Sequence, residues 1–303
     1  MLVQEPQNQA ETVPLPLPVT LSRSALIAPR LSLSSCVRAY VTRSTVGAEL
    51  RPDQRRNHFP ATPLCCITWL LEGDSTLIRR GDECVSEPVP RVSFSGPHTL
   101  PCESVNSGQV EALMLVLTPQ AVRAMAGVDI AAFVNRVAPI SAVFDGPWLA
   151  MVQAVHEAPG DAARVQLIEA FLEPRWRDMR QDAMPTIDRY RYWVEGLALW
   201  VGTAGVGKSL RQIERRIKQW AGLPLRDLRR LARAEESFFL ARDDFVLDTP
   251  KGGPDWSAIA ADTGFADQSH LCRESRRISG LSPNELKKAI GEDESYWVYR
   301  IWE

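Results

Sequence analysis

Short runs of alternating hydrophobic and polar residues occupy the chain between residues 31 and 117. Clusters of Gly, Pro and Asp separate four such runs: LSLSSCVRAYVTRS (31–44), CCITWLLEGDSTLIRR (65–80), RVSFSGPHTL (91–100) and VEALMLVL (110–117). This spacing predicts an antiparallel β-sandwich or barrel. Within it, EGDSTL (72–77) and RRGDE (79–83) are typical of hairpin loops.

Apolar residues recur at helical spacing from residue 118 onwards. Thr118 and Pro119 begin a helix, as N-cap and first helical residue. PWLAMVQAVHEA (147–158) and AARVQLIEAFLEPRW (162–176) each place their apolar residues on one face and predict two amphipathic helices. These helices can close the core of the β-rich part or pair with a second copy of the chain, and we expect core packing.

The segment 256–283, WSAIAADTGFADQSHLCRESRRISGLSP, predicts two helices joined by a tight turn. Gly264 allows a turn at positive φ, and Asp267 caps the second helix. Leu271 and Ile278 lie two turns apart and face inward. A helix of this kind fits the major groove of DNA, which is about 12 Å wide. The side chains left to meet DNA are Gln268, Ser269, His270, Cys272, Arg273 and Arg276.

A second pattern of this kind lies upstream, where Ser209 caps a helix with Leu210, Ile213 and Ile217 on its inner face. Pro224 then begins a longer helix whose apolar side carries Leu225, Leu228, Leu231 and Ala232. The residues of this pattern that we expect at DNA are Lys208, Ser209, Arg211, Glu214, Arg215 and Lys218.

Two stretches carry a resemblance to one family. IAADTGFADQSHLCRESRRISGLSP resembles the second helix-turn-helix of AraC/XylS-type transcription regulators, and SLRQIERRIKQWAGLPLRDLRRLARA (209–234) is similar to the first recognition helix and the connecting helix of that family. The two motifs follow in the family's order, about fifty residues apart. The stretch SFSGPHTLP and the residues 110–127 resemble the cupin-like sensor half of some members.

The resemblance implies an α+β fold, in which a mainly-β, cupin-like domain precedes an all-α domain with two helix-turn-helix motifs joined by a long helix. It also implies sequence-specific binding of double-stranded DNA, contact with RNA polymerase and control through the N-terminal half. By its fork geometry, Arg273 is the best candidate to read a guanine through O6 and N7. Arg276 suits a phosphate, Cys272 a thymine methyl group or packing, and His270 a phosphate or a structural hydrogen bond.

The chain departs from the family at several positions. Ser275 stands where a large aromatic usually packs the second recognition helix onto its scaffold, which leaves a hole worth about 2–4 kcal/mol. Trp256 and the aromatic residues near the C-terminus are the nearest candidates to fill it. Asp227 also replaces an aromatic, so we expect the first motif to read bases with less specificity than the second.

A competing motif is GTAGVGKS (202–209), which fits the G-x-x-x-x-G-K-S loop that cradles nucleotide phosphates. In that alternative, Lys208 meets the phosphates, Ser209 meets Mg²⁺, and LALWV (197–201) is the preceding strand. The α/β alternation of such folds is missing from the sequence, and Ser209 already serves as a helix N-cap. A loop between two helices is therefore the simpler interpretation.

Composition divides the chain into segments. We expect a disordered Pro- and Gln-rich tail over 1–30, a β-rich sensor or oligomerisation domain over 31–145, and helices with a linker over 146–184, the linker near 180–186. The DNA-binding domain spans 185–290, and an aromatic tail spans 291–303.

The formal net charge of −2 conceals an uneven distribution. Residues 1–184 hold 16 Lys and Arg against 19 Asp and Glu, whereas residues 185–290 hold 18 against 14, a balance of +4. This excess is modest, so binding to phosphates depends on local clusters of basic residues.

The remaining features exclude several classes of protein. No apolar run approaches the ~20 residues of a membrane span, and the N-terminus lacks a signal-peptide pattern, which predicts a cytoplasmic protein. The six cysteines include no C-x-x-C pair and are expected to be reduced. The spacing of His58 and His98 does not match that of metal ligands, so we expect no metal site. We also expect no cofactor and no enzymatic activity. A small-molecule effector and a homodimer stay open.

Overall fold

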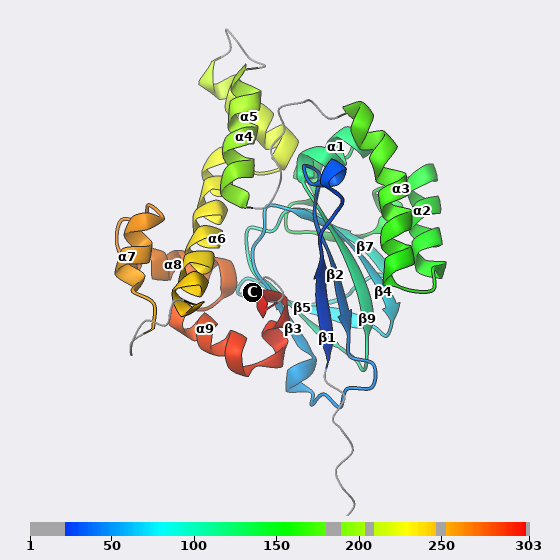
Figure 1. Cartoon of the computed structure of the whole chain (residues 1–303), viewed down its shortest axis with the longest axis horizontal. Helices are drawn as coiled ribbons and strands as arrows, with labels where there is room; N and C mark the ends of the chain where they lie inside the picture. Colours follow the sequence, from blue (N-terminus) through cyan, green and yellow to red (C-terminus); the bar gives the residue numbers. More distant parts are fainter. Residues whose placement is uncertain (1–21, 180–188, 204–208, 247–252, 301–303) are drawn as a thin grey trace, which may run out of the picture.

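The computed structural model describes residues 22–179, 189–203, 209–246 and 253–300. A β-rich N-terminal half precedes an all-helical C-terminal half, as expected of the α+β class (Figure 1). The strands are β1 (Arg23–Ile27), β2 (Val37–Ser44), β3 (Arg56–Phe59), β4 (Cys65–Glu72), β5 (Ser75–Arg80), β6 (Glu83–Pro88), β7 (Val92–Ser95), β8 (Cys102–Asn106), β9 (Glu111–Leu117) and β10 (Val137–Pro139).

The α-helices of the N-terminal half are α1 (Pro119–Ala126), α2 (Gly146–Glu157) and α3 (Asp161–Met179). Those of the C-terminal half are α4 (Tyr190–Thr203), α5 (Leu210–Ala221), α6 (Leu225–Val246), α7 (Trp256–Asp262), α8 (Gln268–Ser279), α9 (Pro283–Glu292) and α10 (Trp297–Arg300). Short 3₁₀ turns are η1 (Leu31–Leu33), η2 (Asp53–Arg55), η3 (Ile130–Phe133), η4 (Ile140–Ala142) and η5 (Glu294–Tyr296). None of the described helices combines the length and apolarity needed to cross a bilayer.

The strands form two antiparallel sheets. One has the order β1-β2-β9-β4-β7-β10 and the other the order β3-β8-β5-β6. The antiparallel β structure expected from the sequence is thus confirmed, and the RRGDE hairpin joins β5 to β6 as predicted. The EGDSTL hairpin is wrong, because β4 pairs with β7 and β9 whereas β5 belongs to the other sheet. Gly73, at a φ of 76°, turns the chain from one sheet into the other.

Part of the predicted N-terminal tail over 1–30 is a strand. Arg23–Ile27 forms strand β1 and pairs with β2 from Arg23 opposite Ser44 to Ile27 opposite Tyr40. The alternation in RSALI suits the edge of a sheet, and the proline run before it hid this signal. Residues 1–21, most of the predicted tail, lie outside the described residues. So does the predicted linker near 180–186.

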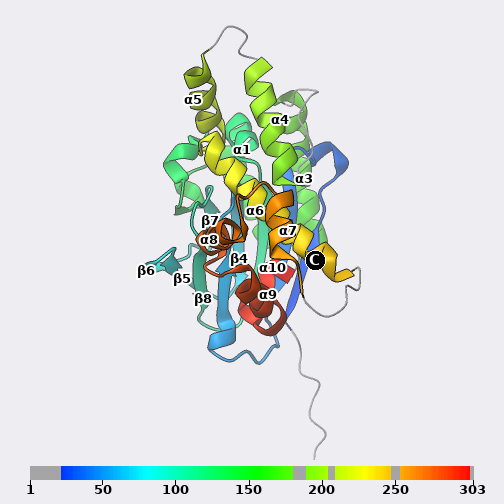
Figure 2. The same cartoon turned by 90° about the vertical axis from the view of Figure 1, so that its left-hand side faces the viewer.

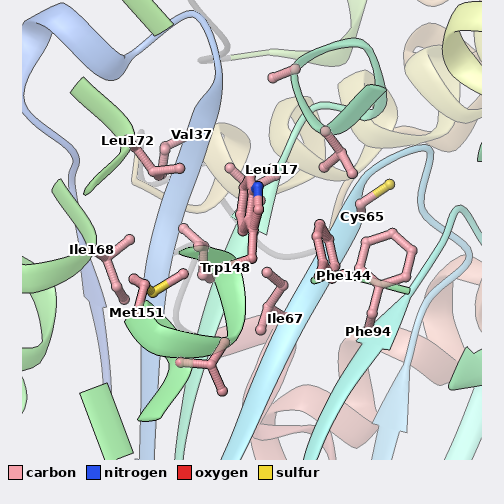
Figure 3. Packing of buried hydrophobic residues seen from close by; sticks show 14 of the residues in the cluster. Val37, Cys65, Ile67, Phe94, Leu117, Phe144, Trp148, Met151, Ile168 and Leu172 are labelled. Atoms are coloured by element: carbon pink, nitrogen blue, oxygen red, sulfur yellow. The ribbon is translucent and has the colours of Figure 1, made fainter. Parts of the chain in front are cut away.

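Helices α2 and α3 cover one face of the six-stranded sheet, on its right in Figure 1. Trp148 and Met151 of α2 and Ile168 and Leu172 of α3 point toward Ile67 and Leu117 of the sheet (Figure 3). The six cysteines are free thiols. The expected core packing of these two helices is confirmed, and each such side chain contributes roughly 1.5–3 kcal/mol through burial.

The C-terminal helices lie on the other side of the sheets (Figure 1). Trp193 and Val194 of α4, Ile217 of α5 and Leu228 of α6 are almost fully buried in one cluster. Leu64, which precedes β4, belongs to the same cluster. The two halves therefore share one hydrophobic core.

The C-terminal segment also packs on the N-terminal half. Trp297 is 2% exposed. Its Nε1 donates at 2.8 Å to Oδ1 of Asn57 in β3, the strand that pairs with β8. The Arg43 guanidinium lies 4.9 Å from the indole centroid and bonds to Glu294 at 2.7 Å. Tyr296 stacks on His58 with 4.4 Å between ring centroids. An ordered anchor therefore occupies 294–300 of the predicted aromatic tail, and residues 301–303 lie outside the described residues.

We predict that Trp297→Ala lowers the free energy of unfolding by about 3–5 kcal/mol, because a buried indole and its hydrogen bond to Asn57 are lost together. Urea denaturation followed by circular dichroism measures the change. Tyr192→Ala removes another large aromatic side chain, one that is 60% exposed, and should change stability by less than about 0.5 kcal/mol. Equal losses in both variants would contradict the anchoring role of Trp297.

Candidate DNA-binding surface

Helices α4 and α5 form the first helix-turn-helix unit. Ser209 begins α5 with a capping box, in which its N–H donates to Gln212 Oε1 at 2.9 Å. Gly222, at a φ of 75°, ends the helix. Ile217 is fully buried and Ile213 half-buried, as expected, while the side chain of Leu210 lies outside the described part.

The outward face of α5 carries the side chains that the sequence assigned to DNA. All of them except Lys208, which lies outside the described residues, are exposed: Ser209, Arg211, Glu214, Arg215 and Lys218. The described residues contain no ion pair to the three basic side chains of this set. The face is therefore open to solvent and predominantly basic.

Helices α7 and α8 form the second unit, with the turn where the sequence placed it. Gly264 has a φ of 76°, and Asp267 Oδ1 accepts from the backbone N–H of His270 at 2.6 Å. Leu271 and Ile278 are 2% and 9% exposed and face inward, as predicted. Asp255 caps α7 by accepting from two backbone N–H groups, which the sequence analysis missed.

The outward face of α8 combines free and engaged groups. Ser269 and Arg273 are exposed, and no described residue forms a hydrogen bond or ion pair with the Arg273 side chain. Gln268 is exposed but accepts from the Ser257 hydroxyl at 3.2 Å, and Arg276 lies 3.8 Å from Glu285. Cys272 is half-buried.

Of the two roles predicted for His270, a phosphate contact or a structural hydrogen bond, the structure shows the hydrogen bond. Its Nδ1 accepts from the backbone N–H of Ala266 at 3.3 Å, and its ring meets Phe265 edge to face at 5.3 Å. The ring therefore holds the turn against α8, and a phosphate contact would have to come from its other nitrogen.

The connecting helix α6 carries both units. It is a single helix of 22 residues, about 33 Å long at 1.5 Å per residue. Leu228, Leu231 and Ala232 are buried, as predicted from their spacing. Figure 2 shows α5 near the top of the molecule and α8 lower down, with α6 passing between them.

Ion pairs fix α8 against α6. Arg230 of α6 bonds to Glu274 of α8 through two nitrogens, from Nε at 3.0 Å and from Nη2 at 2.5 Å, and Arg277 Nε adds a third bond at 3.2 Å. Burial raises the pKa of Glu274, but the hydrogen bond from Arg230 and the charge of Arg277 outweigh this effect and hold it below its usual value. The role of Glu274 could not be predicted from the sequence because its partner in α6 lies 44 residues away.

Both recognition helices also touch the N-terminal half at their C-terminal ends. The Ala61 N–H donates to the Ile278 carbonyl at 2.9 Å, and Arg277 Nη1 donates to the Thr99 carbonyl at 3.1 Å. At the end of α5, a Cβ on Gly222 would lie 2.8 Å from Ile130 Cγ2 of η3. These contacts leave the outward faces uncovered, but they couple each recognition helix to the β-rich half.

The nucleotide-binding alternative lacks its structural context. LALWV, which that alternative requires as a strand, lies inside helix α4. The paired strands in the described part of the chain are antiparallel, whereas a P-loop follows a strand of a parallel sheet. Residues 204–208 of the motif lie outside the described residues, and Ser209 serves as the N-cap of α5.

The histidines and cysteines of the β-rich half take structural positions. His98 is buried, and its Nδ1 lies 3.3 Å from Cys102 Sγ. Burial and the charge of Arg80 lower the pKa of His98 to about 4. Among the described residues, no three or more His, Cys, Asp or Glu side chains lie together where they could hold a metal.

The hole expected at Ser275 is real, but neither predicted candidate fills it. A cavity of about 820 Å³ adjoins Ser275, and Trp256 and Tyr299 form part of its wall. Ser275 Oγ instead donates to the Leu281 carbonyl at 2.8 Å. Trp256 is held at the side because its Nε1 donates to Asn284 Oδ1 at 2.6 Å.

Comparison with known proteins gives little further guidance. No family model and no curated protein matches the chain. A structure of ToxT from Vibrio cholerae, at 11% identity and a TM-score of 0.37, covers 81% of this chain and 97% of its own. An apo form of a ToxT variant from strain SCE256, at 11% and 0.38, covers 88% and 95%. A likeness at these identities and TM-scores supports no assignment of function.

A buried carboxylate fixes the position of α6 against the N-terminal half. Glu235 of α6 accepts from the Tyr190 N–H at 2.5 Å and lies 3.3 Å from Arg38 of β2, whose side chain is 6% exposed. Burial raises the pKa of Glu235 to about 7, because it outweighs the attraction of Arg38. Between the usual value of 4.5 and about 7, the folded chain keeps a proton that the unfolded chain has released.

Stability from this group is therefore present at low pH and is lost as the pH rises to about 7. We predict that Glu235→Gln, compared with wild type, gains about 2–3 kcal/mol of unfolding free energy between pH 5 and pH 8, because the amide carries no charge to bury. Urea denaturation at both pH values measures this difference. Glu236→Gln makes the same change of charge at the next residue, and an equal pH-dependent gain there would refute the assignment to Glu235.

Proposed function

We propose that this protein is a sequence-specific, DNA-binding transcription regulator of the AraC type. The observation that carries the proposal is that one 22-residue helix holds two helix-turn-helix units, each with an exposed recognition face. Two recognition helices held by one rigid helix can enter successive turns of the major groove and read two adjacent half-sites.

The contacts fall into two kinds. Arg273 projects from the middle of α8 with no described partner, which suits a bidentate contact to guanine. Arg276 and the exposed residues of α5, Arg211, Arg215 and Lys218, suit phosphates and set the register. Glu214 can accept, and Gln268 can accept or donate, at base edges, and Lys208 would add a phosphate contact at the start of α5.

The cellular setting belongs to the same proposal. The protein acts in the cytoplasm, binds duplex DNA beside a promoter and positions RNA polymerase without catalysing a reaction. A small molecule or a second copy of the chain would act on the N-terminal half. Its effect would be transmitted to the recognition helices through the contacts of Ala61 with α8 and of Ile130 with the end of α5. Selection of bound fragments from genomic DNA by the full-length protein gives the site, the half-site spacing and the symmetry.

Arg273→Ala should weaken binding to the selected site by about 1–3 kcal/mol and change binding to random DNA little, because only the base contact is lost. Fluorescence anisotropy with both duplexes measures the two affinities. Arg177→Ala, in α3 on the far side of the sheets, removes the same charge from a side chain that is 68% exposed and should change neither affinity. Equal losses on both duplexes in Arg273→Ala would rule out base reading.

Lys218→Ala should weaken binding to the selected and random duplexes alike, and should lower the slope of log affinity against log salt by about 1. The reason is that one phosphate contact releases roughly one counterion whatever the sequence. A salt titration of both duplexes measures the slope. A loss confined to the selected site would show instead that α5 reads a base at this position.

A further inference from the structure

One short segment of the N-terminal half lies between the C-terminal ends of both recognition helices. Segment 130–136 connects η3 to β10. Its Ile130 and Val134 lie at the end of α5, where a Cβ on Gly222 would be 2.8 Å and 3.3 Å from their Cγ2 atoms. Val134 also packs against the hydrophobic cluster that contains Ile217 of α5. The end of the first recognition helix therefore rests directly on this segment.

The other end of the segment reaches α8 through residues 97–99. Asn135 Oδ1 accepts from the Thr99 N–H at 2.7 Å, and Asn135 Nδ2 donates to the Thr99 hydroxyl at 2.9 Å. The Asn135 N–H donates to the Pro97 carbonyl at 2.8 Å. The Thr99 carbonyl in turn accepts from Arg277 of α8 at 3.1 Å. Asn135 and α8 are therefore bonded to the same residue.

Residues 97–99 also reach α8 by a second path. His98 exchanges two backbone hydrogen bonds with Thr62, at 2.8 and 2.9 Å. The neighbouring Ala61 donates to the Ile278 carbonyl of α8 at 2.9 Å. Both of these bonds from the β-rich half to the end of α8 therefore depend on the stretch that Asn135 holds.

The backbone at Asn135 has an unusual conformation. Its φ is 57°, and among the described residues it is the one non-glycine at positive φ. Asn adopts this left-handed region more readily than most residues. The segment also packs closely on the sheet, because a Cβ on Gly96 would collide with the Phe133 carbonyl oxygen. The turn and the close packing together leave the segment little room to shift.

The segment gives each recognition helix a second point of attachment. A helix held at one point can pivot about it, whereas a second point fixes its direction. Glu274 ties the middle of α8 to α6, and Arg277 holds its C-terminal end. Ile217 packs α5 into the cluster shared with α4 and α6, and Gly222 holds its end. Segment 130–136 is common to the two end contacts.

We propose that segment 130–136 fixes the angle between α5 and α8, and that Asn135 is its positioning residue. The path from α5 through this segment and residues 97–99 to α8 acts in parallel with the connecting helix α6. The consequence for DNA rests on the proposed function: two helices already held at the right angle enter their half-sites together, and no ordering of the helices opposes binding.

The distance between the recognition helices in the full-length, DNA-free protein tests the positioning role. Spin labels on p-acetylphenylalanine at the exposed positions Gln219 of α5 and Ser269 of α8 report this distance by double electron–electron resonance, and leave the native cysteines unlabelled. Wild type should give one narrow distribution. Asn135→Ala and Asn135→Gly should roughly double its width, because both remove the side-chain bonds to Thr99. Asn135→Gly adopts the positive φ without strain, so it is the variant that decides where Asn135→Ala fails to fold.

Two further variants separate positioning from general destabilisation. Asn135→Asp keeps the acceptor for the Thr99 N–H and tolerates positive φ, so it should restore the narrow distribution. Thr45→Ala removes another buried, hydrogen-bonded side chain of the β-rich half, whose Oγ1 accepts from the Val110 N–H at 2.9 Å. It should lower the melting temperature without broadening the distribution. An unchanged width in Asn135→Gly, no recovery in Asn135→Asp, or equal broadening in Thr45→Ala would overturn the proposal.

Affinity for the selected DNA site tests the consequence for recognition. Asn135→Gly should weaken binding to the full site by roughly five- to fiftyfold, about the worth of the lost hydrogen bonds, and should leave binding to a duplex with one half-site within about twofold of wild type. Equal losses on both duplexes, or tighter binding to the full site, would also overturn the proposal. If the wild type binds no DNA, the proposed function fails, whereas the distance measurement still decides the role of Asn135.

Discussion

The position of helix α6 is the constraint on which both recognition helices depend. Its apolar side, with Leu228 and Leu231, packs on α4 and α5, and its polar side holds α8 through Arg230. One rigid helix therefore transmits the orientation of each unit to the other. A break within it would free the spacing between the two units.

The same helix is fixed to the β-rich half by a carboxylate that is costly to bury. The charged form of Glu235 gains from Arg38 and from the Tyr190 N–H, yet burial raises its pKa to about 7. Such a pair adds little net stability but has one favoured geometry, so it specifies how the halves meet. The hydrophobic contacts and the Trp297 anchor supply the stability that this pair does not.

The sequence predicted features that depend on neighbouring residues. Thr118 and Asp267 mark helix starts, and Gly264 marks a turn, because caps and turns involve residues within a few positions of each other. The sequence could not predict contacts between distant residues. Trp297 meets Asn57 across 240 residues, and no local period reveals that pairing.

Two further misses have the same origin. Gly73 gave a correct turn signal, but a turn signal does not tell whether the next strand pairs with the previous one or enters another sheet. At the candidate site, the exposed faces of α5 and α8 followed from helical periodicity. The engagement of His270 with Ala266 and of Glu274 with Arg230 did not follow, because hydrogen-bond partners depend on the packed arrangement.

The small side chain at Ser275 changes how α8 is held. A large aromatic there would fix the helix by apolar packing, which tolerates some rotation about the helix axis. In this chain the cavity removes part of that packing, and the directional bonds of Arg230 and Arg277 to Glu274 hold the helix. Since Glu274 and Arg273 are adjacent on α8, these ion pairs set the direction in which Arg273 projects. The rotation of the recognition helix therefore depends chiefly on the charge geometry at Glu274.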